Sequence, residues 1–295
     1  MNIMKYKNVY LLFSLIVLVP GIISLFIYRL NLSNDFTGGS VFSFDLGKSA
    51  HGEKESAAAL FKGQGIRVRE ITFDSIQNIT LQTDPATAKQ NDAIKNAVVS
   101  KYPQAKQTLF ETIGPSIGLE TTKKSVTALG VASIGIVLYI AYAFRNIPKP
   151  YSSFKFGVSA VIAMLHDGLL VLGVFSIFRI QVDALFITAL LTVIGFSVHD
   201  SIVVFDRVRE NLGKLPKSMS FENIVNYSVV ETLNRSLATS FTVIAVLTSL
   251  LLLGGGSTRN FVLALTVGMI SGTYSSIFTA SPILVIWEDF RARTK

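Results

Sequence analysis

The sequence A-L-F-I-T-A-L-L-T-V-I-G-F-S-V-H-D-S-I-V-V-F, residues Ala184 to Phe205, decides the fold class. It is long enough to cross a bilayer, which needs about 20 residues of helix, and it contains one carboxylate, Asp200. Five other blocks share this length and apolar character: Val9 to Leu30, Ser125 to Phe144, Phe156 to Phe178, Ser236 to Leu253 and Phe261 to Trp287. The sequence therefore predicts an α-helical polytopic membrane protein with six transmembrane helices.

The composition of the 295 residues favours the same class. Half of the residues are hydrophobic and 16% are charged, against about 25% in soluble domains. A net charge of +8 could indicate a nucleic-acid binder, but the basic residues lie between the apolar blocks, so no nucleic acid is expected as a partner. The absence of cysteine excludes disulfides and thiolate metal sites, and we expect neither a metal nor a cofactor.

Lysine and arginine predict the orientation, because they accumulate in the cytoplasmic segments of membrane proteins. The two short segments on the outer side hold only Arg179 and Arg259. The first apolar block is longer than a signal-peptide core and no A-x-A site follows, so we interpret it as an uncleaved span. Both termini are predicted to be cytoplasmic, on the side that holds Lys5, Lys7, Arg145, Lys149, Lys155, Arg207, Arg209, Lys214, Lys217, Arg235, Arg291, Arg293 and Lys295.

One long hydrophilic segment, residues 31–124, separates the first span (residues 1–30) from the other five. Alternating and helical patterns give it the order β-α-β-β-α-β, which predicts a small periplasmic ferredoxin-like α+β domain. The expected elements are Gly39 to Leu46, Glu53 to Phe61, Arg67 to Phe73, Asn78 to Thr83, Thr87 to Tyr102 and Gln107 to Ile113. Residues 125–287 are predicted to form a five-helix bundle with an amphipathic interfacial helix over 221–235, and residues 288–295 a cytoplasmic tail.

Asp200 is the candidate proton-coupling residue, because a charged side chain inside a span costs about 2.5–3.5 kcal/mol and needs a partner or a task. A carboxyl group that gains and loses a proton there is what proton-coupled transport requires. The alternative is a buried Asp hydrogen-bonded permanently to backbone, Ser or Thr. Arg235 begins span five on the same side of the membrane and could pair with Asp200, with Glu231 four residues earlier, or with lipid headgroups.

Three further residues in the spans, two histidines and one aspartate, are candidates for a role in proton transfer. His166 and Asp167, near the centre of span three, could form either an interhelical hydrogen bond or a secondary proton relay. His199 adjoins Asp200 but projects about 100° away, which favours a packing or interface role. The sequence contains no G-x-x-x-x-G-K-[ST] or H-E-x-x-H motif, so we expect no enzyme of those hydrolytic classes.

Several segments together resemble the SecF family of the RND superfamily. They are D-F-T-G-G-S at Asp35 to Ser40, the H-D of span three, G-F-S-V-H-D-S-I-V-V-F-D-R-V-R-E-N at Gly195 to Asn211, L-N-R-S-L-A-T-S at Leu233 to Ser240 and Y-S-S-I-F-T-A-S-P at Tyr274 to Pro282. The resemblance implies that Asp200 is the family's intramembrane acid and Arg235 its partner. One departure is His199, where Asn is expected in many relatives.

The resemblance also implies a function in protein export. Members of this family pair with SecD in the bacterial inner membrane, associate with the SecYEG-type protein-conducting channel, and use the proton motive force to promote translocation of unfolded polypeptides. YajC-like and insertase accessory proteins, and membrane lipids, are further expected partners. The alternative is a non-transducing assembly subunit that stabilises SecD and the channel. A small-molecule exporter is a weaker alternative, because such exporters carry much larger external domains.

Overall fold

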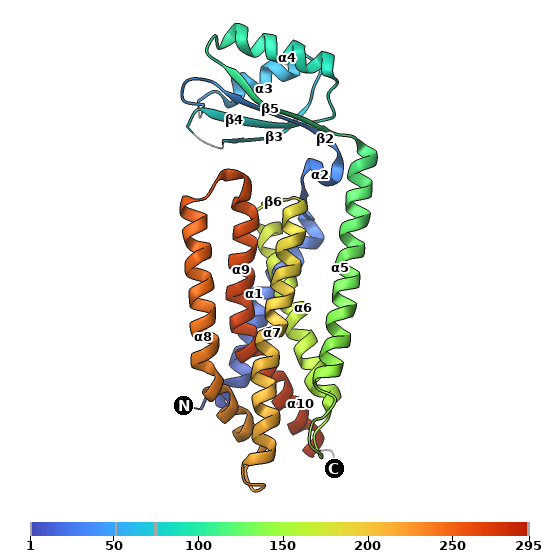
Figure 1. Ribbon diagram of the computed structural model, residues 1–295, viewed down its shortest axis with the longest axis vertical. Helices are drawn as coiled ribbons and strands as arrows, with labels where there is room; N and C mark the ends of the chain where they lie inside the picture. The colour runs from blue at the N-terminus through green and yellow to red at the C-terminus, as the bar shows by residue number, and fades with distance from the viewer. Residues whose placement is uncertain (1, 51, 74–75, 294–295) are drawn as a thin grey trace.

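The structure, a computed structural model, describes residues 2–50, 52–73 and 76–293. It consists of a long helical bundle with an α+β domain over one end, and both chain termini lie at the other end (Figure 1). We call these the domain end and the terminal end. Lys295, one of the basic residues used to predict the orientation, lies outside the described residues.

Within the described residues, six helical segments are long and apolar enough to cross a membrane, as predicted. Five are continuous helices and the sixth is interrupted. The predicted interfacial segment 221–235 is continuous with the fifth span, because no residue between them breaks the helix. The segments are α1 (Lys7–Tyr28, after the short 3-10 turn Met4–Tyr6), α5 (Pro115–Ala143), α6 (Ser153–Ile177), α7 (Ala184–Lys214), α8 (Phe221–Leu253) and α9 (Arg259–Ser275) with its continuation.

The sixth segment contains a π-helical turn, Ser276–Ala280, between α9 and α10 (Ser281–Arg293). Pro282 explains the interruption, because proline has no N–H to donate to the carbonyl four residues earlier and its ring crowds that carbonyl. The Ser281 hydroxyl instead donates to the Ser276 carbonyl at 3.2 Å. Single π turns of this kind occur frequently at functional sites.

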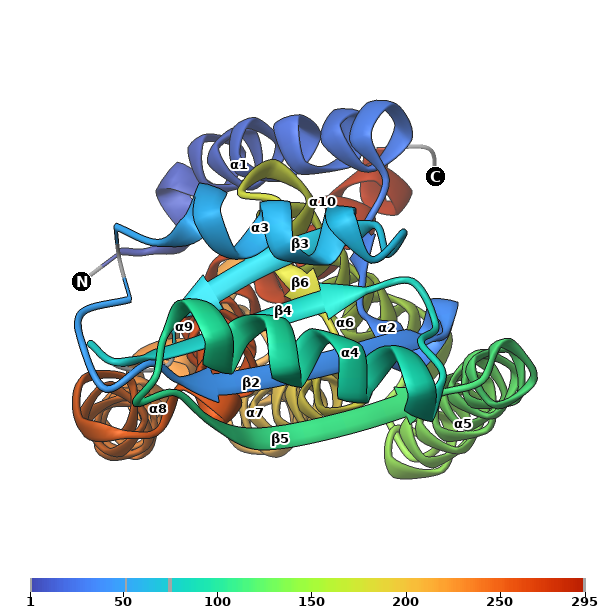
Figure 2. The same ribbon diagram turned by 90° about the horizontal axis from the view of Figure 1, so that it is seen from above.

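Burial is unequal among the spans. In the most apolar 18-residue stretch of α5 only 6% of the residues are buried inside the chain. In the corresponding stretches the buried share is 50% for α6 and α7 and 61% for the last segment. Seen from the domain end, α5 and α8 lie at opposite edges of the bundle with α7 between them (Figure 2). One face of the bundle, formed by α5, α7 and α8, is therefore not covered by other helices of this chain. We call it the open face.

The terminal end is joined by ion pairs. Lys7 of α1 contacts Glu222 of α8 at 2.7 Å and Asp289 of α10 at 2.8 Å. Lys155 of α6 lies 3.3 Å from Glu288, and both side chains are buried. The segment predicted as a tail from residue 288 on is thus helical through Arg293, and its first residues are part of the packed bundle.

The α+β domain has the predicted order of strands and helices. The four strands are antiparallel in the order β3-β4-β2-β5, and both helices cover the face away from the bundle (Figures 1 and 2). Alternate residues of the strands face these helices, and Phe42, Phe44 and Leu81 form a core with Phe61 and Ile94. The elements are β2 (Gly39–Asp45), α3 (Lys54–Gly63), β3 (Val68–Phe73), β4 (Asn78–Thr83), α4 (Ala88–Lys101) and β5 (Lys106–Ile113).

A short helix, α2 (Asn34–Thr37), joins the bundle to the domain. Gly38 and Gly39 follow with φ of +71° and +149°, which glycine adopts without the strain of a side chain. A Cβ on Gly39 would lie 2.5 Å from Asn34 and from the Thr83 carbonyl oxygen. The two glycines therefore let the chain turn from α2 directly into β2.

Candidate functional site

Asp200 lies on the inward face of α7 and is 7% exposed. Both of its carboxylate oxygens accept hydrogen bonds from other helices. Ser236 of α8 donates to Oδ1 at 2.8 Å, and Ser276 of the π turn donates to Oδ2 at 2.5 Å. The acid that the sequence identified is therefore buried and held between three helical segments.

Asp167 on α6 is buried more completely, with no exposed surface. Its Oδ2 accepts from Ser197 of α7 and from Ser275, both at 2.5 Å. Its Oδ1 accepts from Ser271 of α9 at 2.5 Å and lies 3.0 Å from Nδ1 of His166. Asp167 thus has four hydrogen-bonding neighbours drawn from three helices.

The two acids belong to one polar network. Ser275 binds Asp167 and the next residue, Ser276, binds Asp200. On α7, Ser197, which donates to Asp167, lies three residues before Asp200, so one turn of that helix carries both Asp200 and a hydrogen-bond donor to Asp167. The network crosses α6, α7, α8, α9 and the π turn in a bundle whose surroundings are otherwise apolar.

Sequence reasoning missed the serines. Ser275 and Ser276 lie in the segment Y-S-S-I-F-T-A-S-P, which we used only for its resemblance to a family. Hydroxyl side chains are common in membrane helices, where they also bond to the carbonyl one turn earlier, so they carry little signal alone. A pair of serines six and seven residues before Pro282, where the π turn begins, is the local feature that could have indicated them.

His166 connects Asp167 to a cavity of about 330 Å³ between α1, α6 and α9. The side chain is 6% exposed, and its Nε2 is buried without a hydrogen-bond partner among the residues that the structure describes. The rest of the lining is mostly apolar and includes Phe13, Leu170 and Ile270. His166 therefore contacts Asp167 with one ring nitrogen and faces an apolar space with the other.

The expected pair between Arg235 and Asp200 is not present in this conformation. Arg235 is exposed on α8, and within the described ranges its side chain forms an ion pair with neither Asp200 nor Glu231. The reason is the rotation of α8, which points the neighbouring Ser236 at Asp200 and leaves Arg235 on the open face. Arg235 lines a polar cleft with Asp206, Arg207 and Glu231.

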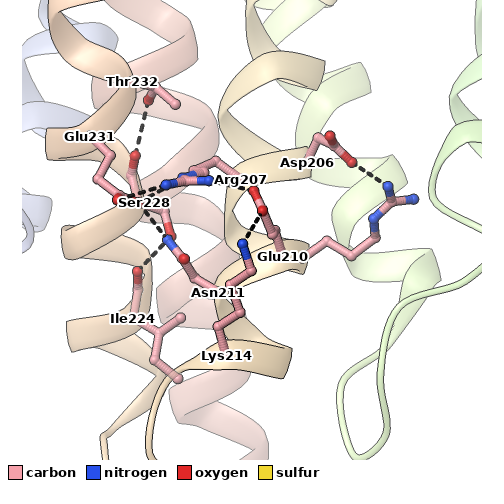
Figure 3. Close-up of polar contacts among 10 residues, drawn as sticks. Asp206, Arg207, Glu210, Asn211, Lys214, Ile224, Ser228, Glu231 and Thr232 are labelled. Atoms are coloured by element: carbon pink, nitrogen blue, oxygen red, sulfur yellow. Dashed lines mark hydrogen bonds and ion pairs between the residues drawn. The ribbon is translucent and has the colours of Figure 1, made fainter.

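Glu231, the other partner considered for Arg235, is bound by Arg207 instead (Figure 3). The Arg207 guanidinium donates to both carboxylate oxygens of Glu231 at 2.7 Å, and Asn211 donates to one of them at 2.8 Å. Arg207 also pairs with Glu210, which in turn binds Lys214. This cluster ties α7 to α8 at the terminal end and leaves Arg235 free for a different contact.

His199 is exposed on α7, whereas the adjacent Asp200 is buried. The structure therefore does not bring His199 into the network around the two acids. Among the described residues, no group of three or more His, Asp or Glu side chains has the arrangement of a metal site.

The fold and the site together define a polytopic membrane protein whose bundle encloses a network of two carboxylates and hydroxyl groups. Two family models match this chain: the protein export membrane protein SecD/SecF C-terminal model over residues 93–289, and the SecD/SecF GG motif model over residues 23–50. The chain belongs to the SecD/SecF family of protein-export membrane proteins.

Relatives with similar sequences cover nearly the whole chain. The protein translocase subunit SecF of Thermobaculum terrenum is 40% identical over 98% of this chain and 94% of its own length. The protein translocase subunit SecDF of Bacillus subtilis is 33% identical over 96% of this chain and 37% of its own length.

Solved structures are similar as well. A crystal structure of SecDF from Thermus, described as a translocon-associated membrane protein, superposes with a TM-score of 0.87 at 31% identity. The match covers 98% of this chain and 39% of that chain, so this chain spans about two fifths of SecDF.

Proposed function

We propose that this chain is the SecF subunit of a SecDF complex, which uses the proton motive force to promote translocation of polypeptides across the bacterial inner membrane. The observation that carries the proposal is Asp200, a buried carboxyl group between three helical segments that must repack if its hydrogen bonds change. In this proposal the termini are cytoplasmic, and residues 31–124 form a ferredoxin-like domain in the periplasm.

The mechanism follows from the position of Ser236 beside Arg235. As a carboxylate, Asp200 accepts hydrogen bonds from Ser236 and Ser276, as it does in this conformation. Successive helix positions differ by about 100°, so a rotation of α8 by about that angle would exchange Ser236 for Arg235 at the acid. Protonation of Asp200 removes the charge that attracts the guanidinium, so the proton selects between the two packings of α8.

The magnitudes are compatible with this exchange. A proton that crosses a potential of 100 mV releases about 2.3 kcal/mol. A hydrogen bond to a charged group contributes about 1.5–3 kcal/mol. One proton per cycle therefore supplies enough free energy to exchange one such contact for another.

The open face of α5, α7 and α8 supports SecD as the partner. Relatives named SecDF are similar to this chain over about two fifths of their length, so the remainder supplies a second set of elements in the same polypeptide. We propose that SecD covers this face and that Arg235 and His199 lie in the contact. A SecYEG-type channel, YajC-like and insertase accessory proteins and the exported polypeptide are further proposed partners.

A non-transducing assembly subunit is the second candidate. The complete hydrogen bonding of Asp167 favours it, because a carboxylate with four neighbours and no exposed surface has the contacts of a permanent packing element. In that case the two acids would stabilise the bundle and the complex with SecD without changing their protonation.

The deciding experiment measures export into membrane vesicles with and without a proton gradient, per assembled complex with SecD. Asp200→Asn should abolish the stimulation by the gradient, and Arg235→Met should reduce it severalfold. Asp92→Asn is the control, since Asp92 is an exposed carboxylate on α4, away from the Asp200 network and from the cleft around Arg235. Full stimulation in Asp200→Asn would refute proton coupling through this acid, and a loss of complex yield alone would favour the assembly subunit.

A further inference from the structure

The first turn of α7 is capped by a carboxylate from outside the helix. Asp35 of α2 accepts a hydrogen bond through Oδ2 from the backbone N–H of Ala184 at 2.9 Å. Asp183, the local cap, accepts from the N–H of Phe186 at 2.8 Å. The free N–H groups and the dipole at a helix N-terminus favour both carboxylates. Only Asp183 is next to α7 in the sequence, so the contact of Asp35 joins α7 to a distant segment.

Asp35 is held firmly by the α+β domain. The backbone N–H of Asp35 donates to Oγ of Ser33, which caps α2. Arg69 of β3 donates to Oγ1 of Thr37 at 2.8 Å and to the carbonyl of Gly38 at 2.9 Å, and it forms an ion pair with Asp84. The short helix that presents Asp35 is therefore fixed to the sheet by a charged side chain.

A second contact joins the α+β domain to the N-terminal end of α7. Gln82 of β4 and Gln181 exchange two hydrogen bonds between their side-chain amides, at 2.7 and 2.6 Å. Gln181 lies two residues before the cap residue Asp183, in the strand β6 (Gln181–Val182), which pairs with β1 (Asn31–Leu32) beside α2. The domain thus contacts the turn before α7 at two places.

The far part of α7 carries Asp200. The helix is uninterrupted over Ala184–Lys214, and at 1.5 Å per residue Asp200 lies about 24 Å from the capped end. Because a continuous helix has no kink or break at which it can bend, a displacement of one end along the axis also displaces the other end. A movement of the domain that displaces Asp35 therefore displaces the helix that positions Asp200, and a repacking around Asp200 displaces Asp35 in return.

We propose that Asp35 is the positioning residue that couples the α+β domain to Asp200 through the N-terminus of α7. The inference rests on the proposed function, because it assigns a link between the proton site, Asp200, and the α+β domain, and it adds a movement of that domain to the proposed function. The hydrogen bond of Asp35 to α7 is the coupling element, and the domain moves together with the turn before α7.

The test uses the assembled complex with SecD in vesicles and compares export with and without a proton gradient. Asp35→Ala should reduce the stimulation by the gradient at least fivefold while the yield of complex is unchanged. Asp35→Asn, whose amide oxygen still accepts from Ala184, should retain at least half of the stimulation. Asp92→Ala is the matched control, since Asp92 is an exposed carboxylate on α4 of the same domain and should have no effect.

A cross-link supplies a readout that a merely structural role would not change. The chain has no native cysteine, so Gln82→Cys and Gln181→Cys can be bridged selectively within it by a short bis-maleimide. The bridge replaces the lost link, and it should restore stimulation in Asp35→Ala and leave the otherwise unaltered chain fully active. Native stimulation in Asp35→Ala, no rescue by the bridge, or inactivation of the unaltered chain by the bridge would each overturn the proposal.

Export by Asp200→Asn distinguishes a failure of the proposed function from a failure of the role assigned to Asp35. Native stimulation in Asp200→Asn removes the proposed function and this inference with it. Loss of stimulation in Asp200→Asn together with native stimulation in Asp35→Ala removes only the role of Asp35.

Discussion

Ser275 and Ser276 are neighbours in the sequence, yet their hydroxyls donate to two different buried carboxylates, Asp167 and Asp200, both at 2.5 Å. The two serines lie where α9 ends and the π turn begins, and successive side chains there point toward different helices. A change in the packing of this turn would therefore alter the hydrogen bonds of both acids together.

Asp167→Ala should destabilise the bundle strongly, because it leaves several buried donors without an acceptor, at about 1–3 kcal/mol each. We expect a loss of more than about 3 kcal/mol, measured by SDS unfolding of the purified chain in mixed micelles. Asp167→Asn should cost much less, since an amide retains one acceptor oxygen and serine hydroxyls rotate to accept from its NH₂ group. If Asp167→Asn also leaves gradient-dependent export unchanged, Asp167 is a packing residue. If the variant loses gradient-dependent export, Asp167 is a member of a proton relay.

Arg207→Met should destabilise the isolated chain more than Arg235→Met does. Arg207 binds Glu231 through two hydrogen bonds and also pairs with Glu210, so its removal should lower the unfolding free energy more than removal of Arg235 does. Arg235 has no ion pair in the described structure and should change stability by less than about 0.5 kcal/mol. Equal losses in the two variants would contradict the geometry of α8 described above.

Gly268→Ala should disturb the packing of α7 against α9. A Cβ on Gly268 would lie 2.1 Å from Val193 Cγ2, so either the Val193 side chain or the two helices must shift, and we expect a loss of about 1–3 kcal/mol. Gly195→Ala on α7 is the matched control, because a Cβ there meets nothing within 4 Å. That control should be neutral or stabilising by about 0.5–1 kcal/mol, since alanine favours helices over glycine. Thermal unfolding of both variants in detergent checks the difference.

Asp183 predicts a pH dependence at the domain end. Burial raises the pKa of the Asp183 carboxyl above its ordinary value of 3.8, and the charge of Asp35 acts in the same direction. The folded chain then binds this proton more tightly than the unfolded chain, so the contribution to stability is present below the ordinary pKa and is lost as the pH rises through the raised pKa. The melting temperature of the native chain should therefore fall more between pH 4 and pH 7 than that of Asp183→Asn.

Asn caps helices as well as Asp does, so Asp183→Asn changes the charge and keeps the hydrogen bond to Phe186. Asp92→Asn, at an exposed position, controls for the change in net charge. Parallel pH profiles of the native chain and Asp183→Asn would contradict the prediction.

The sequence by itself determined the six spans and the order of strands and helices in residues 39–113, because apolar length and alternation are local properties of the chain. It also identified Asp200 and Asp167, since a carboxylate within an apolar block is conspicuous without any knowledge of its neighbours. Only the tertiary structure decided that Ser236 rather than Arg235 contacts Asp200, and that Asp35 caps α7. These contacts join residues 36 and 149 positions apart, and they depend on the rotation and depth of packed helices, which no local pattern specifies.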